Sequence, residues 1–450
     1  MKSKTAAPAR RVDSTPLHRV RVAAFGITLG LGLLVSFILP LRPTVSETEK
    51  RTLSEFPAFS TKALFDGSYF KGIDLWFSDT FPLRETLITA NARIKNLYGI
   101  FPVQVHGDVE QGDDIPDAPP STTAPEETSA PTETTTVKPT TTAPVIDAPD
   151  MADTQSFGAV LMIGDAAFEY YTFKTDIANR YSAMVNATAA KLGDNAAVYA
   201  MVVPSSMGIM LPDSMRATVN SSDQNRAIGY MYASMSNKVR TVDVWDALMA
   251  RRKDYIYFRS DHHWTATGAY YGYAQFAAAK GVIPVPLAEY ESVSYEGFLG
   301  SFYASTNKNT QLSKNPDTVV AYKPVNNTSM TFTDTKGNTI PWKVISDVTN
   351  WSASAKYSTF IGGDNPYSVI TNKDLDDGSS CIVVKESYGN ALVPFLIPHY
   401  QTVHVVDYRY WNGSLPSFVE KNGIQDVLFI TNISATRSDK LVSLMEKISK

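Results

Sequence analysis

Residues 381–392 read C-I-V-V-K-E-S-Y-G-N-A-L, and this stretch decides the fold class of the chain. The apolar run at 381–384 is typical of a buried strand, and residues 388–397 can form a helix that stops at Pro398. The same alternation continues toward the C terminus. The expected elements there are strands at 402–406 and 427–431 and helices at 415–422 and 439–448. This pattern predicts an α/β fold with a mostly parallel sheet flanked by helices.

The sequence on the N-terminal side of this stretch gives a second set of expected elements. Apolar strands are expected at 157–163 and 196–203, with a helix at 176–192 between them, which predicts a parallel βαβ unit. A further short strand is expected at 239–244. Residues 288–368 are richer in Asn, Thr, Ser and Gly, so we expect a less regular insertion that forms a wall of the site.

The N terminus has the pattern of a membrane anchor. Residues 22–39 are apolar and uncharged, about the shortest length that spans a bilayer. Six basic residues precede them: Lys2, Lys4, Arg10, Arg11, Arg19 and Arg21. We therefore expect a cytoplasmic tail at 1–21, a single transmembrane helix at 22–40 and an extracytoplasmic remainder at the cell membrane. A cleaved signal peptide is the alternative, although the run is long and P-L-R-P at 40–43 offers no small-x-small cleavage site.

Composition bounds the remaining possibilities. Residues 105–154 form a Thr/Pro/Glu-rich linker with no apolar face to bury, which predicts disorder. The net charge of −4 over 450 residues gives no reason to expect a nucleic-acid partner. The single cysteine, Cys381, excludes an intrachain disulfide and a Cys-rich metal site. No metal or cofactor is expected.

The residues that follow the predicted strands are candidates for a site, because ligands in open α/β sheets bind at the carboxyl ends of strands. They are Ser387, Asp407, Arg409 and Asn432. Ser387 stands between a strand and a helix, where the backbone N–H groups of Ser387, Tyr388 and Gly389 would favour a developing oxyanion. The alternative is that Ser387 only caps the helix.

A second stretch, at 258–271, reads F-R-S-D-H-H-W-T-A-T-G-A-Y-Y. Asp261 can hold His263 in one tautomer, which makes this imidazole a base for a serine hydroxyl. His262 is expected to face the opposite way and, with Trp264, to pack or to line a pocket. Two alternatives remain: Asp261 caps the following helix, or Asp261, His262 and His263 bind a metal, although no further ligand cluster lies close in sequence.

The motif D-H-H-W-T-x-x-G-A-Y resembles the signature of the DHHW protein family. That family is similar to the SGNH-hydrolase-like domains of alginate and cell-wall polysaccharide O-acetyltransferase accessory proteins. Further similar motifs are E-K-R-T-L-S-E-F-P, D-T-F-P-L-R, G-F-L-G-S-F-Y, F-I-G-G-D-N-P and K-E-S-Y-G-N-A-L-V-P-F-L. Because they flank the linker, we expect residues 44–104 and 155–450 to form one SGNH-like domain that the linker interrupts.

The resemblance implies a triad of Ser387 as nucleophile, His263 as base and Asp261 as the residue that orients the base. Gly363, Asn365 and Asn432 are implied contacts for the oxyanion or substrate. Arg409 is a further candidate for contact with the substrate or for support of the site, against the alternative of a surface ion pair. In the relatives the serine often follows a G-x pair, whereas here Lys385 and Glu386 precede it and place charge near the nucleophile.

The resemblance also implies a function. It predicts a membrane-anchored, extracytoplasmic serine acyltransferase or esterase that acts on O-acetyl groups of cell-surface polysaccharide. A multi-spanning membrane O-acyltransferase would be its acetyl donor. The alternative is a non-catalytic polysaccharide-binding or cell-envelope scaffold that retains the fold, since 23 Tyr and 6 Trp residues offer surfaces for sugars.

Overall fold

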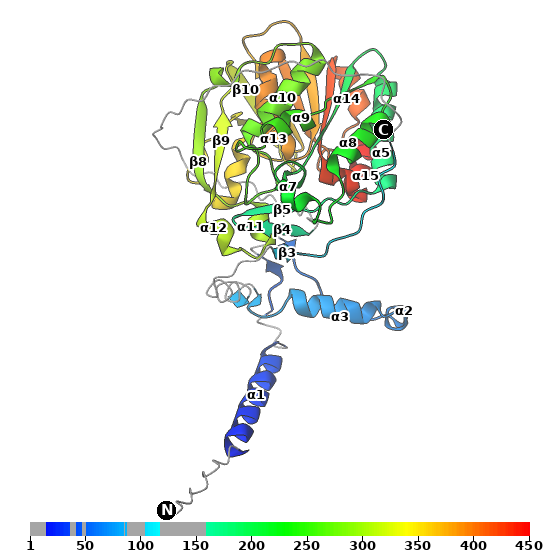
Figure 1. The fold of residues 1–450 in the computed structure, drawn as a ribbon. Helices are drawn as coiled ribbons and strands as arrows, with labels where there is room; N and C mark the ends of the chain where they lie inside the picture. The colour runs from blue at the N-terminus through cyan, green and yellow to red at the C-terminus, as the bar shows by residue number, and fades with distance from the viewer. Residues whose placement is uncertain (1–14, 37–41, 47–50, 85, 88–103, 118–158) are drawn as a thin grey trace, which may run out of the picture. The chain divides into compact units, whose positions relative to one another are not determined.

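The computed structural model describes residues 15–36, 42–46, 51–84, 86–87, 104–117 and 159–450 (Figure 1). The chain divides into two compact units. One comprises residues 1–94 with 152–154, and the other comprises residues 95–151 with 155–450. Most of the expected linker lies outside the described residues, and the single interrupted domain stays a prediction.

The described part of the N-terminal unit contains helices and a pair of two-residue strands. They are helix α1 (Thr15–Ser36), strands β1 (Val45–Ser46) and β2 (Arg51–Thr52), which pair antiparallel, and helices α2 (Thr61–Phe65) and α3 (Ser68–Asp79). Helix α1 covers most of the expected anchor, whose residues 37–40 are outside the described ranges. Among the described helices, none combines the length and the apolar character that crossing a membrane requires. The anchor therefore stays a prediction.

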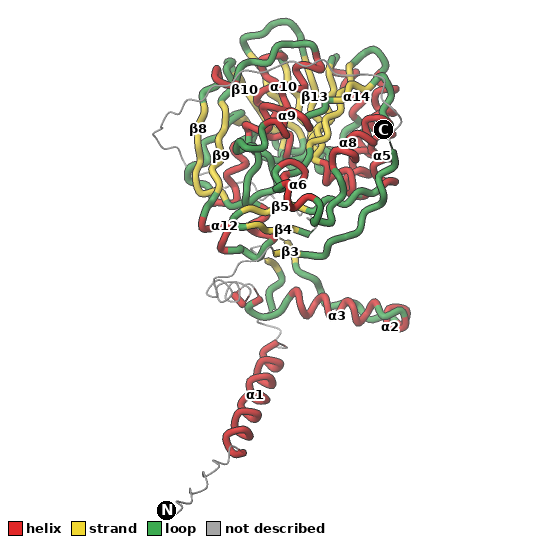
Figure 2. The backbone as a smooth tube through the Cα atoms, viewed as in Figure 1, coloured by secondary structure: helices red, strands yellow, loops and turns green. Residues whose placement is uncertain are grey.

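Within its described residues, the larger unit is built around an eight-stranded mixed sheet (Figure 2). In spatial order its strands are β11 (Thr339–Trp342), β10 (Thr328–Thr333), β12 (Tyr367–Asn372), β14 (Thr402–Asp407), β13 (Ser380–Lys385), β15 (Asp426–Asn432), β6 (Ala197–Val203) and β7 (Val239–Thr241). Strands β14, β13, β15, β6 and β7 run parallel, whereas β11, β10 and β12 are antiparallel to their neighbours. The predicted α/β fold with a mostly parallel sheet is confirmed.

Helices cover both faces of this sheet (Figure 1). One face packs against α5 (Thr175–Leu192), α8 (Gln224–Ala233), α14 (Leu415–Asn422) and α15 (Asp439–Ile448). The other packs against α9 (Trp245–Ala250), α10 (Ala266–Lys280) and α13 (Tyr388–Leu396). Because successive strand residues point to opposite faces, Tyr199 and Met201 of β6 enter one core, and Val198 and Ala200 enter the other. Burial on both sides explains why the parallel strands read as continuous apolar runs.

The parallel βαβ unit expected at residues 157–203 is wrong. The strand expected at 157–163 is β4 (Val160–Ile163), which pairs antiparallel with β3 (Gln104–His106) and β5 (Ala166–Glu169) in a separate sheet. Gly164 adopts a positive φ of 61° in the tight turn after β4, which sends the chain back into β5 before α5 begins. Strand β6 instead pairs with β15 and β7.

The expected irregular insertion at 288–368 is more ordered than its composition indicated. It contains the hairpin of β8 (Ser292–Phe298) and β9 (Asp317–Tyr322), and its strands β10 and β11 extend the main sheet.

The other short helices among the described residues of the larger unit are α6 (Ser206–Ile209), α7 (Asp213–Arg216), α11 (Ser301–Ser305), α12 (Thr310–Lys314), η2 (Leu287–Glu289), η3 (Ala353–Thr359), η4 (Ile397–His399) and η5 (Ile433–Arg437).

Candidate active site

Ser387 lies at the turn between strand β13 and helix α13, at the carboxyl end of a strand in the middle of the sheet. The turn is tight, because the N–H of Gly389 donates to the carbonyl of Glu386 at 3.0 Å. A Cβ at position 389 would come within 2.5 Å of the Cβ of Lys385, so the turn requires glycine there. Ser387 itself is buried.

Residues 261–264 form a loop that enters helix α10. Thr265 caps this helix by accepting from the N–H of Gly268, so Asp261 is not the cap. The loop is held at its start by Asp317, whose Oδ2 accepts from the N–H and hydroxyl of Ser260 at 2.7 and 2.6 Å. It is held at its end by Trp264, whose indole N–H donates to the carbonyl of Tyr388 at 2.9 Å. The loop is thereby tied to the start of α13, directly beside Ser387.

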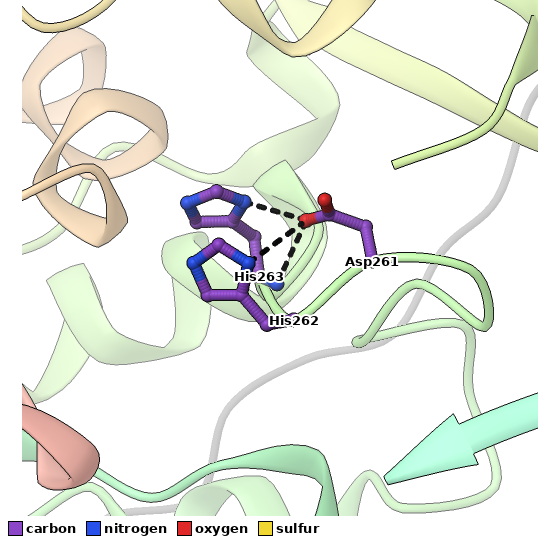
Figure 3. A group of neighbouring side chains, drawn as sticks. All are labelled: Asp261, His262 and His263. Carbon is purple, nitrogen blue, oxygen red and sulfur yellow. Dashed lines mark hydrogen bonds and ion pairs between the residues drawn. The ribbon is translucent and has the colours of Figure 1, made fainter. Parts of the chain in front are cut away.

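Asp261, His263 and Ser387 are joined by two short hydrogen bonds. Nδ1 of His263 lies 2.5 Å from Oδ1 of Asp261 (Figure 3), and Nε2 of His263 lies 2.6 Å from Oγ of Ser387. All three side chains are buried. A serine hydroxyl in this geometry can pass its proton to the imidazole, while the carboxylate balances the charge that forms.

Asp261 is suited to remain ionised. Burial alone would raise the pKa of its carboxyl, but its electrostatic interactions with the imidazoles of His263 and His262 and the hydrogen bonds that it accepts hold the pKa well below the usual value. Its Oδ2 accepts from the N–H of Ser301 at 2.8 Å. A Cβ at Gly300 would lie 2.1 Å from the same oxygen, so this close approach of the backbone depends on glycine.

The expectation that His262 faces the opposite way is wrong. Its ring lies beside that of His263, with centroids 3.8 Å apart, because the loop is too tight to alternate like a strand (Figure 3). Nδ1 of His262 lies 2.7 Å from Oγ of Ser301. Burial and then the charge of His263 lower the pKa of His262 to about 3, so this ring is neutral. Trp264 is fully buried and packs against Gly272 of α10, as a core residue.

The same three residues bring potential metal ligands together. Asp261, His262 and His263 each offer one ligand atom, and these atoms lie within 4.8 Å of one another. However, two ligands bound at about 2.0–2.1 Å to one tetrahedral zinc ion are roughly 3.3 Å apart. The 2.5 Å between Asp261 and His263 is a hydrogen-bond distance instead. The geometry therefore favours a shared proton over a shared ion.

Glu386 places a buried carboxylate next to the serine. Its Oε1 accepts from the N–H of Asn432 at 2.8 Å, and its Oε2 accepts from the N–H of Tyr388 at 3.0 Å. Oε2 also lies 3.3 Å from Oγ of Ser387. Burial raises the pKa of Glu386, although the charge of Arg409 opposes this shift. The Tyr388 N–H, predicted as an oxyanion donor, is thus engaged by a carboxylate in this structure.

The model of the family described as DHHW protein matches residues 49–127 and 128–406. The chain belongs to the DHHW protein family. The crystal structure of a DHHW family protein from Eubacterium siraeum is similar at 30% identity and a TM-score of 0.59, and the match covers 65% of this chain and 96% of that one.

Two further solved structures are more distant from this DHHW protein. PatB1 of Bacillus cereus, solved with a sulfonyl adduct, is 20% identical with a TM-score of 0.53 over 65% of this chain and 98% of that one. The O-acetyltransferase domain of Pseudomonas putida AlgJ is 12% identical with a TM-score of 0.34 over 63% and 96%. No curated protein matches the sequence. The likeness to PatB1 shows a shared fold.

The predicted residue Arg409 belongs to a buried ion network below the serine turn of this DHHW protein. Its guanidinium contacts Asp364 at 2.8 Å and Asp407 at 2.7 Å. Lys385 contacts the same two carboxylates at 3.0 and 2.9 Å. Asn390 of helix α13 donates to Asp364 at 2.8 Å. The surface ion pair considered for Arg409 is therefore wrong, and its observed contacts support the turn that carries Ser387.

The other predicted site residues are placed as follows. Gly363 has a φ of 80° and follows two further residues of positive φ, Ile361 and Gly362. Asn365 is buried and donates to the carbonyl of Gly362 at 3.1 Å. Asn432 is buried, and its side chain accepts from the N–H of Ser434 at 2.6 Å. Their roles toward an oxyanion or substrate stay predictions.

Two residues at the site were missed in the sequence. Tyr357, in η3, stacks on His263 with centroids 4.0 Å apart, and its hydroxyl donates to the carbonyl of Ser387 at 3.0 Å. Nothing in its sequence neighbourhood indicates this. Ser301 contacts both Asp261 and His262. It lies inside the G-F-L-G-S-F-Y motif, which was a usable signal.

Proposed function

We propose that this DHHW protein is a serine acyltransferase or esterase that acts on O-acetyl groups of cell-surface polysaccharide. The observation that carries the proposal is the buried chain from Asp261 through His263 to Oγ of Ser387, with separations of 2.5 and 2.6 Å. A hydroxyl hydrogen-bonded to a base that a carboxylate orients is the arrangement that activates serine nucleophiles.

In the proposed reaction, Oγ of Ser387 attacks the acetyl carbonyl carbon while its proton passes to Nε2 of His263. The tetrahedral intermediate then collapses, the bond to the leaving alcohol breaks, and His263 returns the proton to that alcohol. A sugar hydroxyl or water attacks the acyl-serine in the second half, with His263 again as base. Asn365 is the proposed side-chain donor to the oxyanion, since its amide retains an N–H beyond the bond to Gly362.

The test is acetyl release from 4-nitrophenyl acetate, with and without oligosaccharide acceptors. Wild-type protein should release acetate, and Ser387→Ala should lose all but a residual ~10⁻³ or less of the rate. Ser380→Ala, a buried serine at the opposite end of the same strand, serves as the matched control. Acetylated oligosaccharide as product would indicate transfer, and free acetate alone would indicate hydrolysis. Equal rates for wild type and Ser387→Ala would refute the proposal.

The location and partners are part of the same proposal. The apolar segment 22–40 would anchor the chain, with the basic tail in the cytoplasm and residues 155–450 outside, beside a multi-spanning membrane O-acyltransferase that supplies acetyl groups. Membrane fractionation with protease added to intact cells tests this topology. Digestion of the C-terminal region in intact cells is expected, and its full protection would contradict the orientation.

A non-catalytic polysaccharide-binding scaffold is the second candidate function. Glu386 favours it, because its carboxylate engages the Tyr388 N–H and puts negative charge 3.3 Å from the serine oxygen. Binding of oligosaccharides with equal affinity by wild type and Ser387→Ala, in the absence of acetyl release, would support the scaffold.

A further inference from the structure

The imidazole of His263 packs against two other aromatic rings. The ring of Tyr357 stacks on it at a centroid distance of 4.0 Å and an interplanar angle of 12°. The ring of His262 lies 3.8 Å away at 38°. Both rings therefore lie close enough to contact the imidazole of His263. All three side chains are buried.

Tyr357 contacts both partners of the proton transfer. Its ring covers His263, and its hydroxyl donates to the backbone carbonyl of Ser387 at 3.0 Å. Burial, and then the charges of Asp261 and Glu386, raise the pKa of Tyr357 well above its ordinary value. The phenol therefore remains a neutral donor, and it links the ring of His263 to the backbone of Ser387.

His262 is held by hydrogen bonds of both its side chain and its backbone. Oγ of Ser301 lies 2.7 Å from its Nδ1 and 3.2 Å from its backbone nitrogen, which donates to it. Its carbonyl accepts a hydrogen bond from the hydroxyl of Tyr388. Since burial keeps the imidazole neutral, it can lie against His263 without repelling the positive charge that His263 gains during reaction.

We propose that His262 and Tyr357 are positioning residues that hold the plane of the His263 ring, so that Nε2 stays aimed at Oγ of Ser387 when the imidazole becomes charged. The inference rests on the proposed function. The torsion that turns an imidazole about its Cβ–Cγ bond is broad, and the hydrogen bond to Asp261 alone leaves the ring free to rock. The contacts of the His263 ring with the rings of His262 and Tyr357 restrict this motion. The face of a tyrosine also attracts a cation, and this attraction appears only when His263 is protonated.

Several titratable and charged groups face His263 and influence its protonation. They are Asp261 and His262 on its own loop, Tyr357 on η3, and Glu386 and Tyr388 at the serine turn. Variants at Tyr357 leave the carboxylates Asp261 and Glu386 unchanged. A change in the titration of His263 in these variants therefore reports the ring contact.

Kinetics of 4-nitrophenyl acetate hydrolysis across pH test the inference with paired variants. Tyr357→Leu removes both ring and hydroxyl, and we expect kcat to fall about 10-fold or more with little change in KM. Tyr357→Phe keeps the ring and should retain more activity than Tyr357→Leu. In the same way His262→Phe should retain more than His262→Ala. Tyr295→Phe is the control, because Tyr295 is another buried tyrosine whose hydroxyl donates to a carbonyl, that of Ser346.

NMR titration of ¹⁵N-labelled histidine provides a readout that does not depend on turnover. The midpoint for His263 should move to lower pH by about half a unit in Tyr357→Leu, because the imidazolium loses a stabilising contact. Tyr357→Phe should leave the midpoint near the wild-type value. An unchanged midpoint and kcat in Tyr357→Leu would overturn the inference. If wild-type protein lacks esterase activity while the midpoint still shifts, the proposed function fails and the positioning of His263 stands.

Discussion

Nε2 of His263 lies 2.6 Å from Oγ of Ser387, although 124 positions separate the two residues in the chain. Trp264 holds the two segments together, since its indole N–H donates to the carbonyl of Tyr388, the residue after the serine. Tyr357 provides a second connection, because its ring stacks on His263 and its hydroxyl donates to the carbonyl of Ser387. Base and nucleophile are thus held together through Trp264 and Tyr388, the residues that follow them, and through Tyr357.

Asp261→Asn should reduce kcat about 10³–10⁴-fold with a near-normal melting temperature. The amide would present the wrong partner to Nδ1 of His263 and favour the tautomer that cannot accept the serine proton. Steady-state kinetics with 4-nitrophenyl acetate measure the effect. Asp377→Asn, an exposed carboxylate in the turn before β13, is the control and should match wild type. A loss of less than 10-fold in Asp261→Asn would contradict the role assigned to Asp261.

His262→Phe should make stability less dependent on pH between about 6.5 and 4. The pKa of His262 is about 3 in the folded chain and about 6.5 when unfolded. As pH falls through this window the unfolded chain binds a proton that the folded chain does not, so stability falls by on the order of 1 kcal/mol per pH unit.

Urea denaturation at several pH values measures this slope in wild type and His262→Phe. His404, whose pKa burial likewise lowers to about 4, contributes the same slope to both proteins, so their difference isolates His262. Identical slopes would show that His262 is not neutral in the folded protein.

Asp364→Asn should destabilise the fold by about 3–5 kcal/mol, because it leaves buried Arg409 and Lys385 with one carboxylate fewer. Burial would raise the pKa of Asp364, but the charges of Arg409 and Lys385 outweigh it and lower the pKa. Such a carboxyl stabilises the fold above its unfolded pKa of about 3.9, and this stabilisation is lost as pH falls further. Asp364→Asn should therefore also show a shallower loss of stability on acidification. Wild-type stability of the variant at pH 7 would argue against the network.

Glu386→Gln should lower the free energy of unfolding by about 1–3 kcal/mol. The carboxylate accepts from two backbone N–H groups, those of Tyr388 and Asn432, and an amide offers only one acceptor oxygen for them. Equilibrium denaturation measures the loss, with the exposed Glu289→Gln as control. Unchanged stability would mean that the two N–H groups find other partners.

The sequence predicted those parts of the fold that local patterns determine. The C-terminal strands and helices were predicted within one or two residues, because each apolar run is bounded by a turn or a proline. The strand expected at 157–163 is present as β4 at 160–163, but its sheet was not predicted. Pairing partners depend on contacts distant in the chain, although Gly164 with Asp165 was a local sign of a hairpin.

The residues of the site were likewise predicted only where a local motif indicates them. Asp261, His263 and Ser387 were predicted because each stands in a motif with recognisable chemistry, and the structure brings them together. Tyr357 was not, because an isolated tyrosine in a Ser/Lys-rich segment has no local pattern that places it against an imidazole. The charge of Glu386 was noted, but not its two backbone donors, since these depend on where β15 ends relative to α13.

Covalent labelling of the serine tests the central claim most directly, that His263 activates Ser387 as a nucleophile. Phenylmethanesulfonyl fluoride should form one bond from its sulfur to Oγ of Ser387, release fluoride and pass the hydroxyl proton to His263. Intact-protein and peptide mass spectrometry should find a single sulfonyl adduct on Ser387 in wild type, and at least about 100-fold slower labelling in His263→Ala. Labelling of Ser387 at the same rate in His263→Ala, or no labelling of Ser387 in wild type, would contradict the account.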